Sequence, residues 1–96
     1  KMEALVARGL PRDFRDIFQL CREGIASPEQ LWELWARRRA AVREEADRDQ
    51  AAVAVRTNLE RIEKARPLDK IEQQTDREAA ERLRAWFSET FLHGLV

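Results

Sequence analysis

Four charged side chains near the start of the chain have types and spacings suited to binding a polyphosphate and its metal ion. Lys1 and Arg8 are seven residues apart on one predicted helix, so they lie within about 20° of each other around the axis and about 10 Å apart along it. Asp13 and Asp16 are at i and i+3 on a second predicted helix, where such residues are surface neighbours. The cations would face phosphates, lysine as a point charge and arginine as a bidentate fork.

Each of these residues also has an ordinary structural explanation. Asp13 is in the first turn of its predicted helix, where negative charge is stabilising. Asp16 can pair with Arg12 at i, i+4. Lys1 and Arg8 can simply belong to a solvated helix face or pair with acids of a neighbouring helix. The residue types alone leave both interpretations open.

The same stretch resembles the later motifs of the AbiEii/AbiGii-type nucleotidyltransferases, toxins of bacterial toxin–antitoxin and abortive-infection systems. The family pattern is a lysine, an apolar stretch, an arginine, and then Arg-Asp-aromatic-x-Asp-(Leu/Ile)-aromatic. The matching residues here are Lys1, Ala4-Leu5, Arg8 and the segment Arg12-Asp13-Phe14-Arg15-Asp16-Ile17-Phe18. The resemblance covers residues 1 to about 39 and does not extend beyond them.

The resemblance implies the transfer of a nucleotidyl group from a nucleoside triphosphate (NTP) to an acceptor, tRNA in some members, with Mg²⁺. Carried over by position, Lys1 would hold the triphosphate, and Arg8 or Arg12 would fix charges nearby. Asp13 and Asp16 would be the catalytic residues, supporting metal, acceptor or base chemistry. The implied reaction is an in-line displacement on metal-held phosphates.

The chain departs from the family in one respect: it has neither the Gly-Ser motif nor the acidic metal ligands of the nucleotidyltransferase sheet. The resemblance therefore implies the C-terminal helical part of a longer bacterial transferase, inactive alone. Its expected partners are the missing N-terminal domain, an antitoxin protein and an acceptor such as tRNA. A chain that opens on lysine fits a fragment, although Met2 could be an initiator.

Composition predicts one soluble helical domain over residues 1–96. The chain is 44% hydrophobic and 38% charged with three glycines and three prolines, which favours long solvated helices over sheets. Lys plus Arg equals Asp plus Glu at 18 each, which argues against a general nucleic-acid-binding surface. The single cysteine excludes an internal disulfide and suits the cytoplasm. No apolar run approaches the ~20 residues of a membrane span.

Turn and capping signals divide the chain into helices. Gly9 and Pro11 predict a break between helices over about 1–8 and 11–23. Ser27-Pro28-Glu29-Gln30 and Thr75-Asp76-Arg77-Glu78 read as capping boxes, and we favour two helices rather than one over residues 28–65. We predict an all-α fold, an irregular bundle of four to six helices. The predicted core consists of Leu5, Phe14, Ile17, Phe18, Leu31, Trp35, Leu59, Ile62, Leu83, Trp86 and Phe87.

Two further functional hypotheses come from other classes of protein. The first is a stand-alone helical protein-interaction module, in which the early acids are only helix-start charges. The second is an RNA-contacting domain that uses Arg37–Arg39 and the nearby tryptophans, although core packing is the better explanation for Trp32 and Trp35. An exposed apolar surface is expected where a missing domain would dock, and it could drive a homodimer of the isolated chain.

Overall fold

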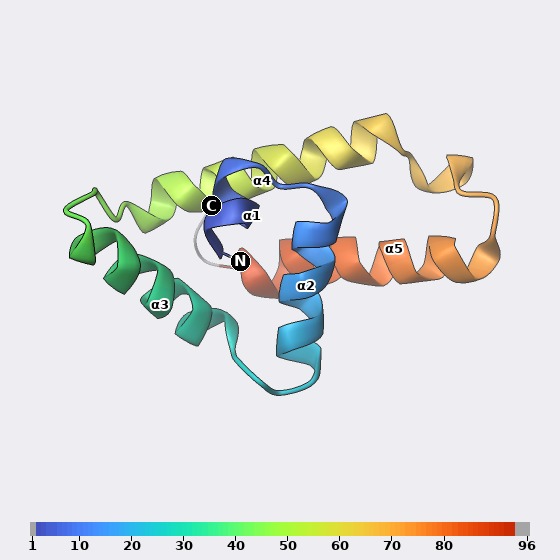
Figure 1. Ribbon diagram of the computed structural model, residues 1–96. Coiled ribbons are helices and arrows are strands. Elements are labelled where there is room, and N and C mark those ends of the chain that lie inside the picture. Colours follow the sequence, from blue (N-terminus) through green and yellow to red (C-terminus); the bar gives the residue numbers. More distant parts are fainter. Residues whose placement is uncertain (1, 94–96) are drawn as a thin grey trace.

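Five α-helices and two shorter helical turns make up residues 2–93, the residues that the computed structural model describes (Figure 1). The helices are α1 (Met2–Ala7), α2 (Pro11–Arg22), α3 (Pro28–Ala41), α4 (Arg48–Ala65) and α5 (Gln74–Trp86). A 3₁₀ turn, η1 (Leu68–Lys70), joins α4 to α5, and a π-helical turn, η2 (Phe87–Phe91), follows α5. No strand occurs within residues 2–93, so the predicted all-α fold is confirmed, as is the division of residues 28–65 into two helices.

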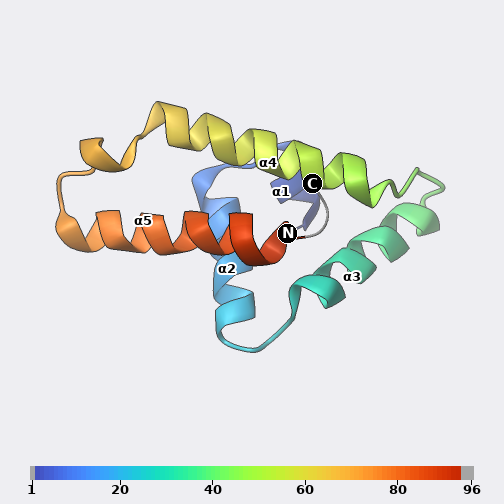
Figure 2. The same ribbon diagram turned by 180° about the vertical axis from the view of Figure 1, so that it is seen from behind.

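The helices form an irregular arrangement about 45 × 27 × 22 Å in extent. In both views α4 and α5 run alongside each other and are joined through η1, while α2 crosses α5 (Figures 1 and 2). Helices α3 and α4 are joined at the other end of the molecule and diverge from there toward its middle, where α1 contacts α2, α3 and α4. The crossing of α2 over α5 places the N-terminal helices next to the C-terminal aromatic residues.

Most helix starts follow the predicted local signals. Ser27 caps α3 by accepting a hydrogen bond from the Gln30 backbone N–H (3.1 Å), and the Gln30 side chain accepts one from the Ser27 N–H (2.9 Å). Asp47 accepts from the Gln50 N–H (3.1 Å) and thereby caps α4. These caps satisfy donors at the helix start that have no partner within the helix.

The predicted capping box at Thr75 is wrong. Helix α5 begins at Gln74, two residues before the start that a Thr75 cap implies, and its N-cap residue Gln73 makes no side-chain capping bond. The cause is the Arg77 guanidinium, which donates back to the Ile71 carbonyl (3.2 and 3.1 Å). Ile71 is buried, so this contact anchors the first turn of α5 to the connector.

Aromatic side chains from α2, α3, α5 and η2 form the centre of the core. Phe14 meets Phe87 edge to face at 4.9 Å between ring centroids, and Trp32 lies 5.4 Å from Phe91. Edge-to-face packing is a favoured geometry for aromatic pairs and adds to the burial of their apolar area. The predicted core residues that are buried are Leu5, Phe14, Ile17, Leu31, Trp35, Leu59 and Phe87. The predicted core residues Phe18, Ile62, Leu83 and Trp86 are only partly buried. Trp32 is buried, as core packing of the tryptophan pair implies, and the prediction missed Met2, Ala51, Ala52, Val55, Ile71, Phe91 and Leu92.

Helix α1 is attached to α4 through a buried asparagine. The Asn58 side-chain amide donates to the carbonyls of Leu5 (3.0 Å) and Val6 (3.2 Å) at the end of α1. Gly9 follows with a φ of +60° and lies against the Asn58 side chain, so that a Cβ at this position would be 2.5 Å from the Asn58 Cγ. The absence of a side chain at Gly9 therefore allows both the left-handed turn and the approach of α1 to α4.

We expect Gly9→Ala to destabilise the fold more than Gly24→Ala. Both glycines have positive φ, +60° and +74°, so alanine costs about 1–2 kcal/mol at either site. At Gly9 the methyl group also overlaps Asn58, which adds about 1–3 kcal/mol, whereas at Gly24 nothing lies within 4 Å. Urea unfolding of the two variants measures the difference, and equal losses would show that the close approach at Gly9 does not matter.

Candidate functional site

The sequence-predicted site lies at the corner between α1 and α2, and its central feature is an ion pair between Arg8 and Asp13. The Arg8 Nε donates to Asp13 Oδ2 at 3.0 Å, and its Nη2 donates to Oδ1 at 2.7 Å. The Leu10 backbone N–H also donates to Oδ2, at 2.8 Å. Asp13 is therefore both the bidentate partner of an arginine and the residue that caps the start of α2 from its third position.

The corner keeps Asp13 ionised although the side chain is only 6% exposed. The hydrogen bonds from Arg8 are the main cause that lowers the pKa of the Asp13 carboxyl, and burial opposes them. The Leu10 N–H and the charges of Arg8 and Arg12 lower this pKa further. The same pair raises the pKa of Arg8, whose side chain remains 45% exposed.

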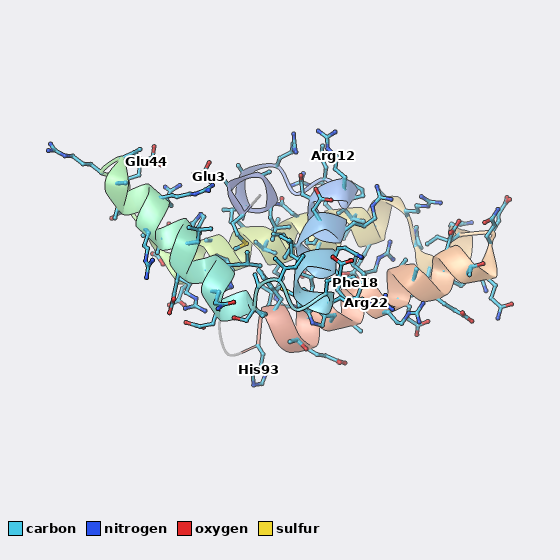
Figure 3. The ribbon with its side chains drawn as sticks, turned by 60° about the horizontal axis from the view of Figure 1, so that its bottom comes forward. Glu3, Arg12, Phe18, Arg22, Glu44 and His93 are labelled. Atoms are coloured by element: carbon cyan, nitrogen blue, oxygen red, sulfur yellow. The ribbon has the colours of Figure 1, made fainter. Side chains whose placement is uncertain are left out.

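Arg12 and Asp16 lie on the outer surface of α2 and are exposed. Figure 3 shows Arg12 at the outer end of α2, with its side chain directed away from the other helices. At 100° per residue, Asp16 is about 60° around the axis from Asp13 and about 40° from Arg12. The structure thus brings Arg8, Arg12 and Asp13 to one corner with Asp16 beside them, while Lys1 lies outside the described residues.

The carboxylates of this corner do not make a metal site by themselves. No group of three or more His, Cys, Asp or Glu side chains in residues 2–93 could hold a metal ion. Both oxygens of Asp13 already accept hydrogen bonds from Arg8 and Leu10. Mg²⁺ commonly takes one or two carboxylates and completes its shell with phosphates and water, so a metal at this corner would need ligands from outside residues 2–93.

The tryptophans proposed for base stacking belong to the core. Trp32 is 1% and Trp35 3% exposed, and their rings meet edge to face at 5.5 Å. The Arg39 guanidinium lies over the Trp35 ring at 5.4 Å and pairs with Glu44 at 3.3 Å. The structural interpretation of this pair is therefore confirmed, and neither ring presents a face on which a nucleobase could stack.

A second candidate site is a groove between α2, α4 and α5 that the sequence did not predict. Its volume is about 710 Å³. Apolar residues from all three helices line it, and five arginines with exposed or partly exposed side chains surround them. The apolar residues are Leu10, Pro11, Phe14, Phe18, Leu59, Ile62, Ala65, Ile71, Ala79, Ala80 and Leu83, and the charged residues are Arg15, Arg22, Arg61, Arg66, Arg84 and Asp76.

The groove and the corner lie on different sides of α2. Asp13 and Phe18 are about 140° apart around the axis, and Asp16 and Phe18 about 160° apart, whereas Arg15 at the edge of the groove is about 60° from Arg12. Figure 3 shows Phe18 and Arg22 toward the end of α2 opposite to Arg12. The only elements common to the two sites are α2 and the turn Gly9–Pro11 that precedes it. The chain therefore offers two separate surfaces for ligands.

Comparisons with protein-family models, with curated proteins and with solved structures find no match for this chain. Within residues 2–93, none of the helices is both long enough and apolar enough to cross a bilayer.

We expect Asp13→Asn to lower stability by about 1–3 kcal/mol at pH 7, since it removes charge-assisted bonds from a buried site. The pKa of Asp13 in the folded protein lies below its ordinary value of about 4. The carboxylate therefore contributes fully to the free energy of unfolding above that ordinary value, and this contribution is lost as the pH falls through the folded-state pKa. When the pH is lowered from 7, the free energy of unfolding should therefore fall less in Asp13→Asn than in the parent protein. Urea unfolding at several pH values measures this difference.

The matched control is Glu29→Gln, which breaks a second bidentate pair, with Arg48 (3.0 and 2.7 Å). Glu29 is 63% exposed, so Glu29→Gln should lower stability less than Asp13→Asn does. Equal losses of stability in Asp13→Asn and Glu29→Gln would contradict this account of the corner. So would a pH dependence of stability in Asp13→Asn that equals that of the parent protein.

Proposed function

We propose that the chain is the helical substrate-positioning part of a nucleotidyltransferase similar to the AbiEii/AbiGii toxins. The observation that supports this most directly is the corner of α1 and α2, where Arg8, Arg12 and Asp13 of the family-like pattern come together with Asp16 beside them. In this proposal a catalytic sheet supplied by an N-terminal domain holds Mg²⁺ and the reacting phosphates. The acceptor would be a nucleic acid such as tRNA.

The geometry refines the roles proposed for the four residues. Asp13 is a positioning residue, because its two oxygens hold Arg8 and the Leu10 N–H. The exposed guanidinium of Arg12 is the group best placed to meet phosphate oxygens, assisted by the exposed part of Arg8. Asp16, exposed on the next turn, would face the metal or the acceptor. Lys1 remains a proposed triphosphate ligand.

The chain's own contribution to the reaction is therefore placement of charge. The two arginines of the corner would orient the triphosphate and spread part of its charge, and both effects favour an in-line displacement. The Arg8–Asp13 pair fixes one guanidinium in advance, so less conformational entropy is lost when the phosphates arrive. The chain alone should bind NTP weakly and transfer nothing.

We expect the isolated chain to bind Mg–ATP with a Kd on the order of 1 mM and Arg12→Ala to weaken this binding about tenfold, because a charge-assisted phosphate contact is lost. The measurement is a titration followed by ¹H–¹⁵N NMR. The shifts should be confined to Arg8, Arg12, Asp16 and their neighbours.

Arg15→Ala is the matched control, because Arg15 is also an exposed arginine of α2 but lines the groove. It should leave the titration unchanged. Shifts that follow the groove residues, or that persist in Arg12→Ala, would contradict a phosphate site at the corner. The parent reading frame gives an independent test: a Gly-Ser motif followed by acidic strands upstream supports the enzyme, and a frame that starts at Met2 removes most of its support.

The second candidate function is a helical protein-interaction module without catalysis. The groove between α2, α4 and α5 favours it, because a volume of about 710 Å³ lined by apolar side chains is larger than packing defects in a closed core. Under this alternative the corner is only a structural joint. The enzyme predicts a phosphate ligand at the corner, and the interaction module predicts a protein ligand in the groove. Variants of Arg12 test the first prediction, and variants of groove residues test the second.

A further inference from the structure

The groove exists because α4 and α5 run alongside each other without packing closely. The close helix contacts in residues 2–93 join α1 to α2, α3 and α4, and α2 to α5, whereas α4 and α5 are not among the closely packed pairs. The facing side chains Ile62 and Leu83 are consequently only partly buried. Two helices of a hairpin normally bury their facing apolar sides against each other. Here that apolar area faces the groove instead.

The sides of the groove are shaped to receive a helix. Ala65 on α4 and Ala79 and Ala80 on α5 are small, so a helix laid between them could approach both backbones closely. The lining runs over six residue steps of α4, from Leu59 to Ala65, which is about 9 Å. Along α2 it runs from Pro11 to Arg22, about 16 Å. A helical segment of about 8–12 residues has a matching length.

The charges around the groove are almost entirely positive. Five arginines and one aspartate line it, and none of the five takes part in the ion pairs formed between described residues, which are Arg8–Asp13, Arg39–Glu44 and Arg48–Glu29. Arg84 donates to the Arg66 carbonyl (2.8 Å) and Arg61 to the Asn58 side-chain oxygen (2.6 Å). These bonds orient the two guanidinium groups without neutralising them.

We propose that the groove binds an acidic amphipathic helix of a partner protein, with the apolar side of that helix against α4 and α5 and its carboxylates against the arginines. Apolar burial provides the affinity in this mode of recognition, and the charges select the partner and speed its association. Among the arginines of the groove, the guanidinium groups of Arg15, Arg22 and Arg66 form no hydrogen bond or ion pair within residues 2–93. Arg15 and Arg22 lie one on each side of Phe18 along α2, where they can pair with carboxylates.

An acidic helix fits this groove better than an RNA strand does. Glu63, Asp69 and Glu81 line an adjoining hollow of about 490 Å³, which shares Arg84 with the groove, and these carboxylates would repel a phosphate backbone that continued past it. Trp32 and Trp35 are buried, and of the two rings that line the groove Phe14 is buried and Phe18 is partly exposed. The chain has no net charge, whereas nucleic-acid-binding domains are usually basic. This proposal concerns the groove alone and holds under either proposed function.

The test uses the full chain and a fluorescein-labelled peptide of about 14 residues with leucines at i, i+3, i+4 and i+7 and glutamates elsewhere. A second peptide has the same leucines with lysines in place of the glutamates. We expect fluorescence anisotropy to give a Kd on the order of 10 μM for the acidic peptide and binding at least tenfold weaker for the basic one. Raising the salt concentration should weaken acidic-peptide binding.

The variant Arg15→Glu/Arg22→Glu should weaken acidic-peptide binding at least tenfold, and the matched double change Arg37→Glu/Arg38→Glu on exposed positions of α3 should not. Ala79→Trp, a change at an exposed position, should fill the groove and also block binding. Circular dichroism checks that each variant is folded. None of these variants changes Arg12. A negative result with the peptides therefore does not contradict the proposed phosphate site at the corner, and a negative Mg–ATP titration does not contradict peptide binding in the groove.

Several results would overturn the proposal. Equal binding of the acidic and basic peptides, or acidic-peptide binding that survives Arg15→Glu/Arg22→Glu, would remove the charge argument. Binding of a single-stranded RNA, but not of the acidic peptide, with loss in Arg15→Glu/Arg22→Glu, would make the groove a nucleic-acid surface. Sedimentation showing a dimer that Ala79→Trp dissociates would make the occupant a second copy of the chain.

Discussion

The buried carboxylate of Asp13 is the constraint on which the N-terminal half of the structure depends. A side chain that is 6% exposed cannot remain charged unless its oxygens are paired, and Arg8 and the Leu10 N–H pair both of them. Helix α1 has only six residues and would not be stable alone. Its position is fixed by this ion pair on one side and by the amide of Asn58 on the other.

The sequence predicts the features that depend on a few neighbouring residues. Ser27 and Gln30 are three positions apart, so their reciprocal bonds follow from local geometry, and the structure contains both. Asn58 could not be found in this way, because its partners Leu5 and Val6 are more than fifty residues away in sequence. Thr75 fails as a cap because Arg77 is bonded to the buried Ile71 connector, a contact that depends on tertiary packing.

The same distinction applies to the two candidate sites. Arg12, Asp13 and Asp16 could be named from the sequence because their spacing on one helix fixes which of them are neighbours. The part played by Arg8 in neutralising Asp13 depends on the angle between α1 and α2, which the pattern does not specify. The groove could not be predicted from the sequence, because Phe18, Ile62 and Leu83 have the spacing of core residues and that spacing predicts that they are buried. They are only partly buried because α4 and α5 stay apart, and a period of 3.6 residues says which side of a helix is apolar but not what covers it.

Helix α2 is the element that both surfaces share, and the geometry of its first turn decides how strongly they are coupled. One side of the turn is held by the three hydrogen bonds of Asp13, and on the other Leu10 and Pro11 form part of the groove wall. A ligand in the groove could move Arg12 only by shifting this turn, and that would expose or unpair a buried carboxylate. Breaking this pair costs about 1–3 kcal/mol, as for Asp13→Asn, and a ligand in the groove gains no contact in return. The corner and the groove should therefore bind their ligands almost independently, with free energies that add.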